Sequence, residues 1–256
     1  MVNRPSLRFP LNLGAALILL SALCGCDRRT KNETTSTNNS ATLPTSGVVA
    51  HAGVITGQVF FSGADPNLPP LDISSVPDCA RHHPNGLPDE TVVINPNGTL
   101  KNVVVYLKDG PRSGGATQPA PMLDQVDCQY VPHVIAAQVG RPLLIKSSDP
   151  FLHNVHIAES EPAINWAFIG SQQRQVIFQK SGCFTVRCDV HPWMKAMICV
   201  LDTGCFAVSD DRGHFAISNI PPGHYTLVAH HERFGDLSRS VEVPPDGSVN
   251  TEFKYQ

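Results

Sequence analysis

Residues 188–194 read Cys-Asp-Val-His-Pro-Trp-Met, and this stretch decides how the rest of the chain is interpreted. It offers a thiolate at Cys188, an imidazole at His191 and a thioether at Met194. Two more imidazoles lie upstream in residues 151–156, which read Phe-Leu-His-Asn-Val-His. Two imidazoles and a thiolate in one plane, with a weak axial thioether, make a blue-copper electron-transfer site. The stretch therefore predicts a copper-binding loop at the end of a β-structure, completed by a histidine from a distant strand.

Other interpretations of these residues fit less well. A disulfide at Cys188 would suit an exported protein, and each histidine alone could be an ordinary polar residue. Zinc is disfavoured because structural zinc sites are built from Cys and His, whereas Met194 offers a thioether. Covalent haem attachment needs the pattern C-x-x-C-H, which the sequence does not contain.

The same stretches resemble the cupredoxin family in its amicyanin-like form. The resemblance rests on the short C-x2-H-x2-M loop, with a proline and an aromatic residue after its histidine. It rests also on the Leu-His-Asn-Val-His segment, because the first histidine of the corresponding segment binds copper in that family. The resemblance extends from about residue 125 to residue 202 and implies one type 1 (blue) copper. The four ligands that it implies are His153, Cys188, His191 and Met194.

The resemblance implies further roles around the ligands. Asn154 would brace the two loops that carry the ligands. His191 would present an exposed edge, and Pro192 and Trp193 beside it would form an apolar docking patch. The alternative for Trp193 is a residue that caps the core. His156 is expected to point away from the copper.

The flanking segments resemble a second family, the carboxypeptidase regulatory-like domain, which is a small transthyretin-like β-sandwich. Residues 209–215 (Ser-Asp-Asp-Arg-Gly-His-Phe) and 219–227 (Asn-Ile-Pro-Pro-Gly-His-Tyr-Thr-Leu) carry its hairpin, Pro-Gly turn and Tyr-led strand. The expected domains are the cupredoxin copper-binding domain, 121–202, and a discontinuous sandwich from 51–120 and 203–256. The alternative is two separate small β-units on either side of the copper domain.

Composition and local pattern predict an all-β protein. The two resemblances imply a cupredoxin Greek-key β-barrel or sandwich, inserted in or flanked by an immunoglobulin- or transthyretin-like β-sandwich. Charged residues make up 16% of the chain, and there are 19 Gly and 22 Pro residues, which favours turns and short strands. Runs rich in β-branched and aromatic residues, such as 54–61 and 102–107, end at turn-forming residues, as strands do. No persuasive helical period is present, and 64–90 and 110–121 are expected to be irregular.

The N-terminus reads as an export signal followed by a tether. Residues 1–26 place Arg4 and Arg8 before a short apolar stretch and end in Leu-Cys-Gly-Cys, which resembles a bacterial lipobox. This implies lipidation at Cys26, against the alternative of an ordinary signal peptide with a spare cysteine. Residues 27–50 are polar and without periodicity, as in a flexible tether. The protein is therefore expected to be exported, at the periplasmic or cell-surface face of a membrane.

Five cysteines remain besides Cys26 and Cys188 in the mature domain. They are Cys79, Cys128, Cys183, Cys199 and Cys205. Because five is an odd number, at least one stays unpaired unless it bonds to another molecule. Cys79 could pair with Cys128 across two irregular segments, and Cys183 with Cys199 on either side of the ligand loop. Cys205 is an alternative partner, so the sequence leaves the connectivity open.

The expected function is one-electron transfer by an exported, membrane-anchored copper protein with a redox protein as its partner. A formal net charge of −3 speaks against nucleic acid as a partner, because nucleic-acid-binding domains are basic. An enzyme is not expected, since the sequence contains no second set of copper ligands. Two alternatives stay open: a copper storage, delivery or sensing protein, and a surface interaction module with a structural copper.

Overall fold

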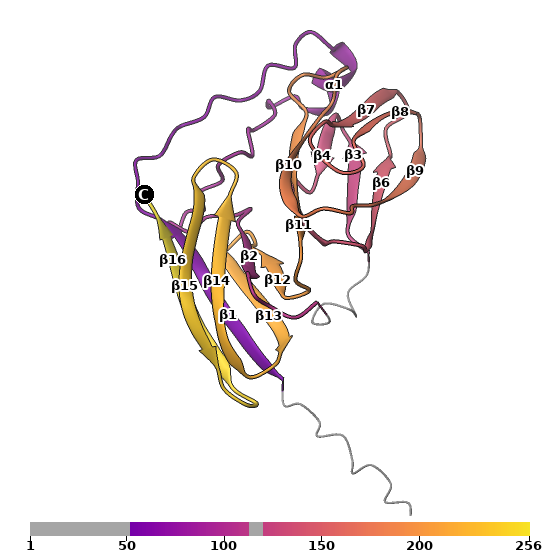
Figure 1. The fold of residues 1–256 in the computed structure, drawn as a ribbon. Helices are drawn as coiled ribbons and strands as arrows, with labels where there is room; N and C mark the ends of the chain where they lie inside the picture. Colours follow the sequence, from indigo (N-terminus) through magenta and orange to yellow (C-terminus); the bar gives the residue numbers. More distant parts are fainter. Residues whose placement is uncertain (1–51, 113–119) are drawn as a thin grey trace, which may run out of the picture. The chain divides into compact units, whose positions relative to one another are not determined.

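The computed structural model describes residues 52–112 and 120–256. Within these residues it contains sixteen strands and one short helix, so the prediction of an all-β protein is confirmed (Figure 1). The predicted signal, 1–26, the lipidation site Cys26 and the tether, 27–50, lie outside the described residues. None of the described residues belongs to a helix that is long and apolar enough to cross a membrane.

The first and last strands of the chain build one pair of sheets, which we call the terminal sandwich. One sheet has the order β13-β1-β16 and the other β12-β2-β14-β15. These strands are β1 (Gly53–Phe61), β2 (Val104–Leu107), β12 (Phe206–Val208), β13 (His214–Ile220), β14 (Gly223–His231), β15 (Gly235–Val243) and β16 (Ser248–Tyr255). Alternate residues of β1 are buried, as expected for a strand with one face on a core. Ile55 and Phe253 of the first sheet share that core with Leu107 and Leu227 of the second.

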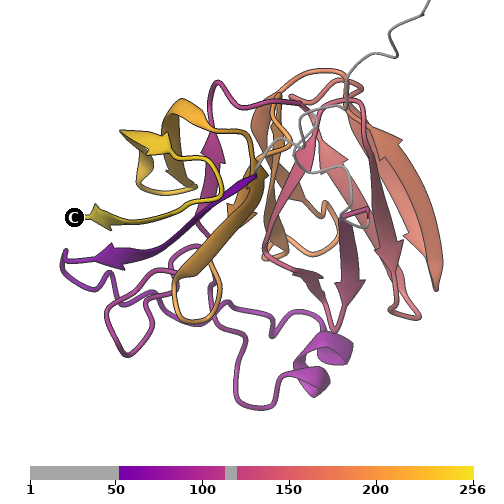
Figure 2. The same cartoon turned by 90° about the horizontal axis from the view of Figure 1, so that it is seen from below.

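The strands between them build a second pair of sheets, which we call the inserted sandwich (Figure 2). Its sheets have the orders β4-β3-β6-β9 and β5-β11-β10-β7-β8. These strands are β3 (Met122–Val126), β4 (Gln129–Val131), β5 (Val134–Gln138), β6 (Pro142–Ser147), β7 (Leu152–Ile157), β8 (Ile164–Ile169), β9 (Gln172–Ile177), β10 (Gly182–Arg187) and β11 (Lys195–Leu201). Leu143 and Ile145 of one sheet meet Val155, Phe168 and Ile198 of the other in a single buried core.

The chain passes from the terminal sandwich into the inserted sandwich after β2 and returns to it at β12, and these two strands are neighbours. β2 and β12 pair antiparallel, with Val104 opposite Val208, and the whole of β3–β11 lies between them in sequence. Met197 and Leu201 of β11 pack with Val104 in a smaller core where the two sandwiches meet. Met197 is therefore a core residue, as its place in a β-strand indicates.

The stretch 64–90, expected to be irregular, contains the only helix in the described part of the chain, α1 (Pro77–His82). Pro77 stands at the start of the helix, where its missing N–H is no loss. Asp78 in the first turn and Arg81 in the last turn match the helix dipole. Six residues are too few to carry a visible helical period, which explains why sequence periodicity does not predict α1.

Candidate metal centre

Three of the four predicted ligands lie together at one end of the inserted sandwich. One nitrogen each of His153 and His191 and the Cys188 sulfur lie within 4.8 Å of one another, and all three residues are buried. The distance from Cys188 Sγ to His191 Nδ1 is 3.7 Å. His153 belongs to β7, whereas Cys188 and His191 follow the end of β10. A local loop and a distant strand therefore converge on one point.

The ligand loop is closed by its own backbone. The Cys188 N–H donates to the carbonyl oxygen of Met194 at 3.2 Å, and the Met194 N–H donates to that of His191 at 2.9 Å. The fourth predicted ligand, Met194, is 2% exposed and belongs to the same core as Cys188. The short spacing of the motif thus becomes a tight turn between β10 and β11, and this turn keeps the three side chains at the same end.

Asp149 orients the imidazole of His153. Its Oδ2 lies 2.8 Å from His153 Nε2, and both side chains are buried. An ionised carboxylate only accepts hydrogen bonds, so Nε2 carries the proton and Nδ1 keeps its lone pair. That Nδ1 is buried and has no hydrogen-bond partner within the described part of the chain. Metal-binding histidines are held in this way by a carboxylate on the far nitrogen.

Asp149 is a functional residue that motif reasoning missed. Its carboxylate also accepts the N–H of Asp127 at 2.8 Å and of Cys128 at 2.9 Å. Asp127 and Cys128 have φ values of 51° and 59°, and two consecutive left-handed residues turn their N–H groups toward one anion. The only sequence signal was an acidic residue four positions before His153.

Asn154 lies between the two loops that carry the ligands. Its Oδ1 accepts the backbone N–H of Asp189, and its Nδ2 donates to Asp189 Oδ2 at 2.9 Å and to Asn165 Oδ1 at 2.9 Å. Its own backbone N–H points at Cys188 Sγ, 3.5 Å away. His156 is turned away from the ligands and contacts Asp189 Oδ1 at 3.1 Å. Asn154 therefore connects β7 to the loop that follows β10.

Burial keeps both imidazoles neutral. The pKa of His153 is lowered chiefly by burial, which outweighs the attraction of Asp149. The pKa of His191 is lowered to about 4, first by burial and then by the nearby His153. Neutral imidazole is the form that binds a metal ion, so neither ring has to lose a proton to a metal near neutral pH.

The residues present fit a copper ion. Cys188 has no disulfide partner within the described residues, so its sulfur is free to bind a metal. The donor set of one thiolate and two imidazoles, with a thioether at Met194, combines the soft and intermediate donors that copper prefers. The buried, unpartnered Nδ1 of His153 is the clearest mark of a missing ligand, because such an atom is costly without a partner.

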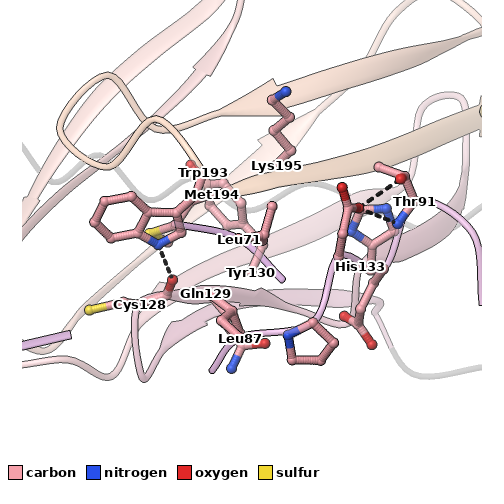
Figure 3. Close-up of a pocket in the computed structure, with 13 residues that line it drawn as sticks. Leu71, Leu87, Thr91, Cys128, Gln129, Tyr130, His133, Trp193, Met194 and Lys195 are labelled. Carbon is pink, nitrogen blue, oxygen red and sulfur yellow. Dashed lines mark hydrogen bonds between the residues drawn. The ribbon is translucent and has the colours of Figure 1, made fainter. Parts of the chain in front are cut away.

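The predicted docking patch is wrong at Trp193. The Trp193 side chain is 9% exposed, and its indole N–H donates to the carbonyl oxygen of Cys128 at 3.2 Å (Figure 3). His191 is 3% exposed, so its expected surface edge is covered as well. Of the predicted patch only Pro192 is exposed. The physical reason is that residues 71–87, which lie outside the sandwich, pack over this end.

The structure pairs four of the five remaining cysteines. Cys79 is bonded to Cys128, and Cys183 to Cys199. Cys183 and Cys199 are directly opposite one another on β10 and β11, the strands that flank the ligand loop. Cys205 is buried and unpaired among the described residues. One disulfide therefore links two paired strands, and the other joins a segment distant in sequence to the turn at Cys128.

Comparison with known proteins gives similarity to solved structures alone. No family model matches the sequence, and no curated protein matches it. A copper-containing nitrite reductase from Thermus scotoductus SA-01 is 21% identical with a TM-score of 0.29; the match covers 32% of this chain and 23% of the reductase. A Cu(I) structure of an amicyanin variant is 19% identical with a TM-score of 0.30, over 38% of this chain and 97% of amicyanin. A reduced amicyanin variant is 19% identical with a TM-score of 0.30, over 39% and 98%.

The chain thus spans less than a quarter of the nitrite reductase and nearly the whole length of amicyanin. The side chains of His153, Cys188 and His191, and the groups that hold them, indicate a metal centre.

Proposed function

We propose that this protein is an exported, membrane-tethered type 1 copper protein that carries single electrons between redox partners. The observation that carries the proposal is the buried trio of His153, Cys188 and His191, whose donor atoms lie within 4.8 Å of one another. A copper ion bound there supplies one-electron redox chemistry. Cys188 would provide the thiolate, His153 and His191 the two imidazoles, and Met194 the thioether.

Rigid ligands are what an electron carrier needs, because little rearrangement then accompanies each change of charge. Asp149 fixes the tautomer and direction of the His153 ring. Asn154 joins the two ligand loops and points its backbone N–H at the Cys188 sulfur, which tempers the charge on that sulfur. Burial of all three ligands keeps bulk water away from the centre.

In the described part of the chain, the other clusters of metal-binding side chains offer no second, independent metal site, and this favours a carrier over an enzyme. Among the described residues, the remaining groups either include cysteines already bonded to each other or share His153 or His191 with this centre. The proposal therefore has one copper and no separate catalytic metal. A storage or delivery role would suit an exposed and loosely held site, whereas the ligands here are buried.

Export and anchoring complete the proposal. The lipobox-like end of residues 1–26 supports lipidation at Cys26, and the polar residues 27–50 support a tether between the lipid and the folded part. The terminal sandwich, by its resemblance to the carboxypeptidase regulatory-like domain, would be a non-catalytic scaffold around the copper-binding part. The partner is a redox protein that reaches the same membrane face.

The test is the spectrum and voltammetry of the purified full chain loaded with Cu(II). The proposal predicts an intense visible absorption from thiolate-to-copper charge transfer and a reversible one-electron wave. Cys188→Ala should abolish the colour, whereas Cys205→Ala, which removes the other buried free thiol, should keep it. A colourless Cu(II) protein, or colour that survives Cys188→Ala, would contradict the proposal.

A further inference from the structure

A segment outside both sandwiches covers the ligand loop. Residues 71–87, which we call the cap, include α1 and are closed by a hydrogen bond from the Leu71 N–H to the Leu87 carbonyl oxygen at 2.8 Å. Ile73 and Leu87 are buried in the core of the inserted sandwich together with Met194. Leu71, Leu87 and Met194 line the same cavity of about 70 Å³ (Figure 3). The cap thus packs against Met194, the fourth predicted ligand.

The cap is fastened at one turn of the inserted sandwich, the turn between β3 and β4. The Cys79–Cys128 disulfide joins α1 to this turn. His82 Nδ1 lies 2.9 Å from Asp127 Oδ1, and His83 Nε2 lies 2.5 Å from the Asp127 carbonyl oxygen. Both histidine contacts are partly exposed and therefore weak. The buried disulfide is the strong connection.

The disulfide lies directly against one predicted ligand. A sulfur of Cys79, a sulfur of Cys128 and a ring nitrogen of His191 lie within 4.8 Å of one another, and all three residues are buried. The His191 ring also packs against Trp193, with ring centroids 5.2 Å apart. The cap and its disulfide therefore form the surface against which the His191 imidazole rests.

The same disulfide reaches the other imidazole through the backbone of Cys128. The Cys128 N–H donates to Asp149 at 2.9 Å, and Asp149 in turn holds His153 at 2.8 Å. The Cys128 carbonyl oxygen accepts the indole N–H of Trp193, which belongs to the ligand loop. One residue thus connects the cap, the Asp149–His153 pair and the ligand loop.

We propose that the Cys79–Cys128 disulfide and the cap it fastens belong to the copper centre, which they close to solvent while holding both imidazoles in place. The inference rests on the proposed function, since it assigns a positioning role toward the copper site. It follows that copper enters or leaves only when the cap moves. It follows as well that a redox partner docks elsewhere than on the His191 ring.

The other disulfide offers a matched control. Cys183–Cys199 also lies in the inserted sandwich, but it joins residues that β10 and β11 already hold opposite one another. Neither of its cysteines is grouped with a predicted copper ligand. Its removal therefore tests the loss of a disulfide without the loss of the cap.

The experiment measures how fast a chelator extracts copper from the full chain, together with the visible spectrum and the copper affinity. In Cys79→Ala/Cys128→Ala we expect the extraction rate to rise and the copper affinity to fall by about 10- to 100-fold, as when partners of metal ligands are removed. The visible spectrum should shift as well. Cys183→Ala/Cys199→Ala should match the wild type under conditions in which all variants are folded. Wild-type extraction rate, affinity and spectrum in the Cys79→Ala/Cys128→Ala variant would overturn the inference.

Leu87→Ala keeps the disulfide and tests the cap if the double variant does not fold. Leu87 is 2% exposed, so its truncation leaves a cavity and loosens the packing of the cap. Faster extraction with an unchanged spectrum supports closure by the cap, and wild-type extraction overturns it. A wild type that forms no coloured copper site would instead contradict the proposed function, so the two failures are distinguishable.

Discussion

Asp149 accepts a hydrogen bond from Nε2 of His153 at 2.8 Å, and the side chains of His153 and Asp149 are only 0% and 5% exposed. The carboxylate raises the basicity of the ring and fixes which nitrogen faces the metal. Asp149→Asn keeps the size of the side chain and removes its charge. We therefore expect copper affinity to fall by about 10- to 100-fold. The reduction potential should rise, because one negative charge that favours Cu(II) is lost. Competition with a chelator and voltammetry measure the two effects.

The control for this variant is Asp124→Asn. Asp124 belongs to β3 of the same sandwich and bonds to Lys146 at 3.0 Å and Ser148 at 2.8 Å, without contact to a predicted ligand. Its neutralisation should leave copper affinity and potential near the wild-type values. Equal effects of the two variants would mean that Asp149 acts through the overall charge of the sandwich and not through His153.

The sequence alone predicts the ligands because three of them lie close together in the chain. Cys188, His191 and Met194 stand on one short loop, and the loop closes on its own backbone hydrogen bonds. The sequence alone does not predict the role of Asp149, because that role depends on the left-handed turn at Asp127 and Cys128. That turn is the connection between β3 and β4, so no residue spacing near His153 indicates it.

Asn154→Ala should weaken the apoprotein as well as the copper site. The Asp189 N–H loses its acceptor, and the two ligand loops lose their connection. We expect the free energy of unfolding to fall by about 1–3 kcal/mol, because several partly buried hydrogen bonds are lost and each contributes about 0.5–1.5 kcal/mol. Urea unfolding of the metal-free protein measures this.

Asn250→Ala is the matched control for Asn154→Ala. The Asn250 side chain bonds to Thr56 on the surface of the terminal sandwich at 3.3 Å. Its truncation should change the free energy of unfolding by much less, because water replaces an exposed partner. If Asn154→Ala is no more destabilising than Asn250→Ala, the hydrogen bonds of Asn154 between the ligand loops do not stabilise the fold.

The parts of the fold that sequence patterns predict are the strands with a clear buried face, such as β1, which corresponds to the predicted run 54–61. β8 is less visible, because it lies at the edge of its sheet and only Ile164 and Phe168 are fully buried. The cap was unreadable for a different reason. Its few apolar residues carry no periodicity, and the Cys79–Cys128 disulfide and the burial of Ile73 and Leu87 that bring it over His191 are contacts between segments far apart in the sequence. The exposure expected of Trp193 was therefore wrong.

Cys26→Ala should release the protein from the membrane. The lipobox-like sequence predicts that the Cys26 thiol carries the lipid. We expect wild type in the membrane fraction of cells and the variant in the soluble exported fraction, with metabolic labelling by a fatty acid lost. Cys24→Ala alters the other cysteine of the same stretch and should stay labelled and membrane-bound. Labelling that depends on Cys24 and not on Cys26 would show that the lipid is attached to Cys24 instead.

His231 should make the stability of the metal-free protein depend on pH. Burial, followed by the charges of His230, His133 and Arg233, lowers its pKa from 6.5 to about 4. The unfolded chain therefore takes up a proton at a higher pH than the folded one. Stability is then full above pH 6.5 and falls as the pH drops toward 4, by about 3 kcal/mol in all.

Urea unfolding of the metal-free protein at pH 5 and pH 7 measures the effect of His231. His231→Phe keeps a ring against Phe234, whose centroid lies 4.7 Å away, and should flatten the dependence. His224→Gln, an exposed change on the same strand, should not. Because the variants are compared at the same pH, the contributions of groups that do not interact with His231 cancel. A His231→Phe variant with the full wild-type loss between pH 7 and 5 would show that His231 is not the group responsible.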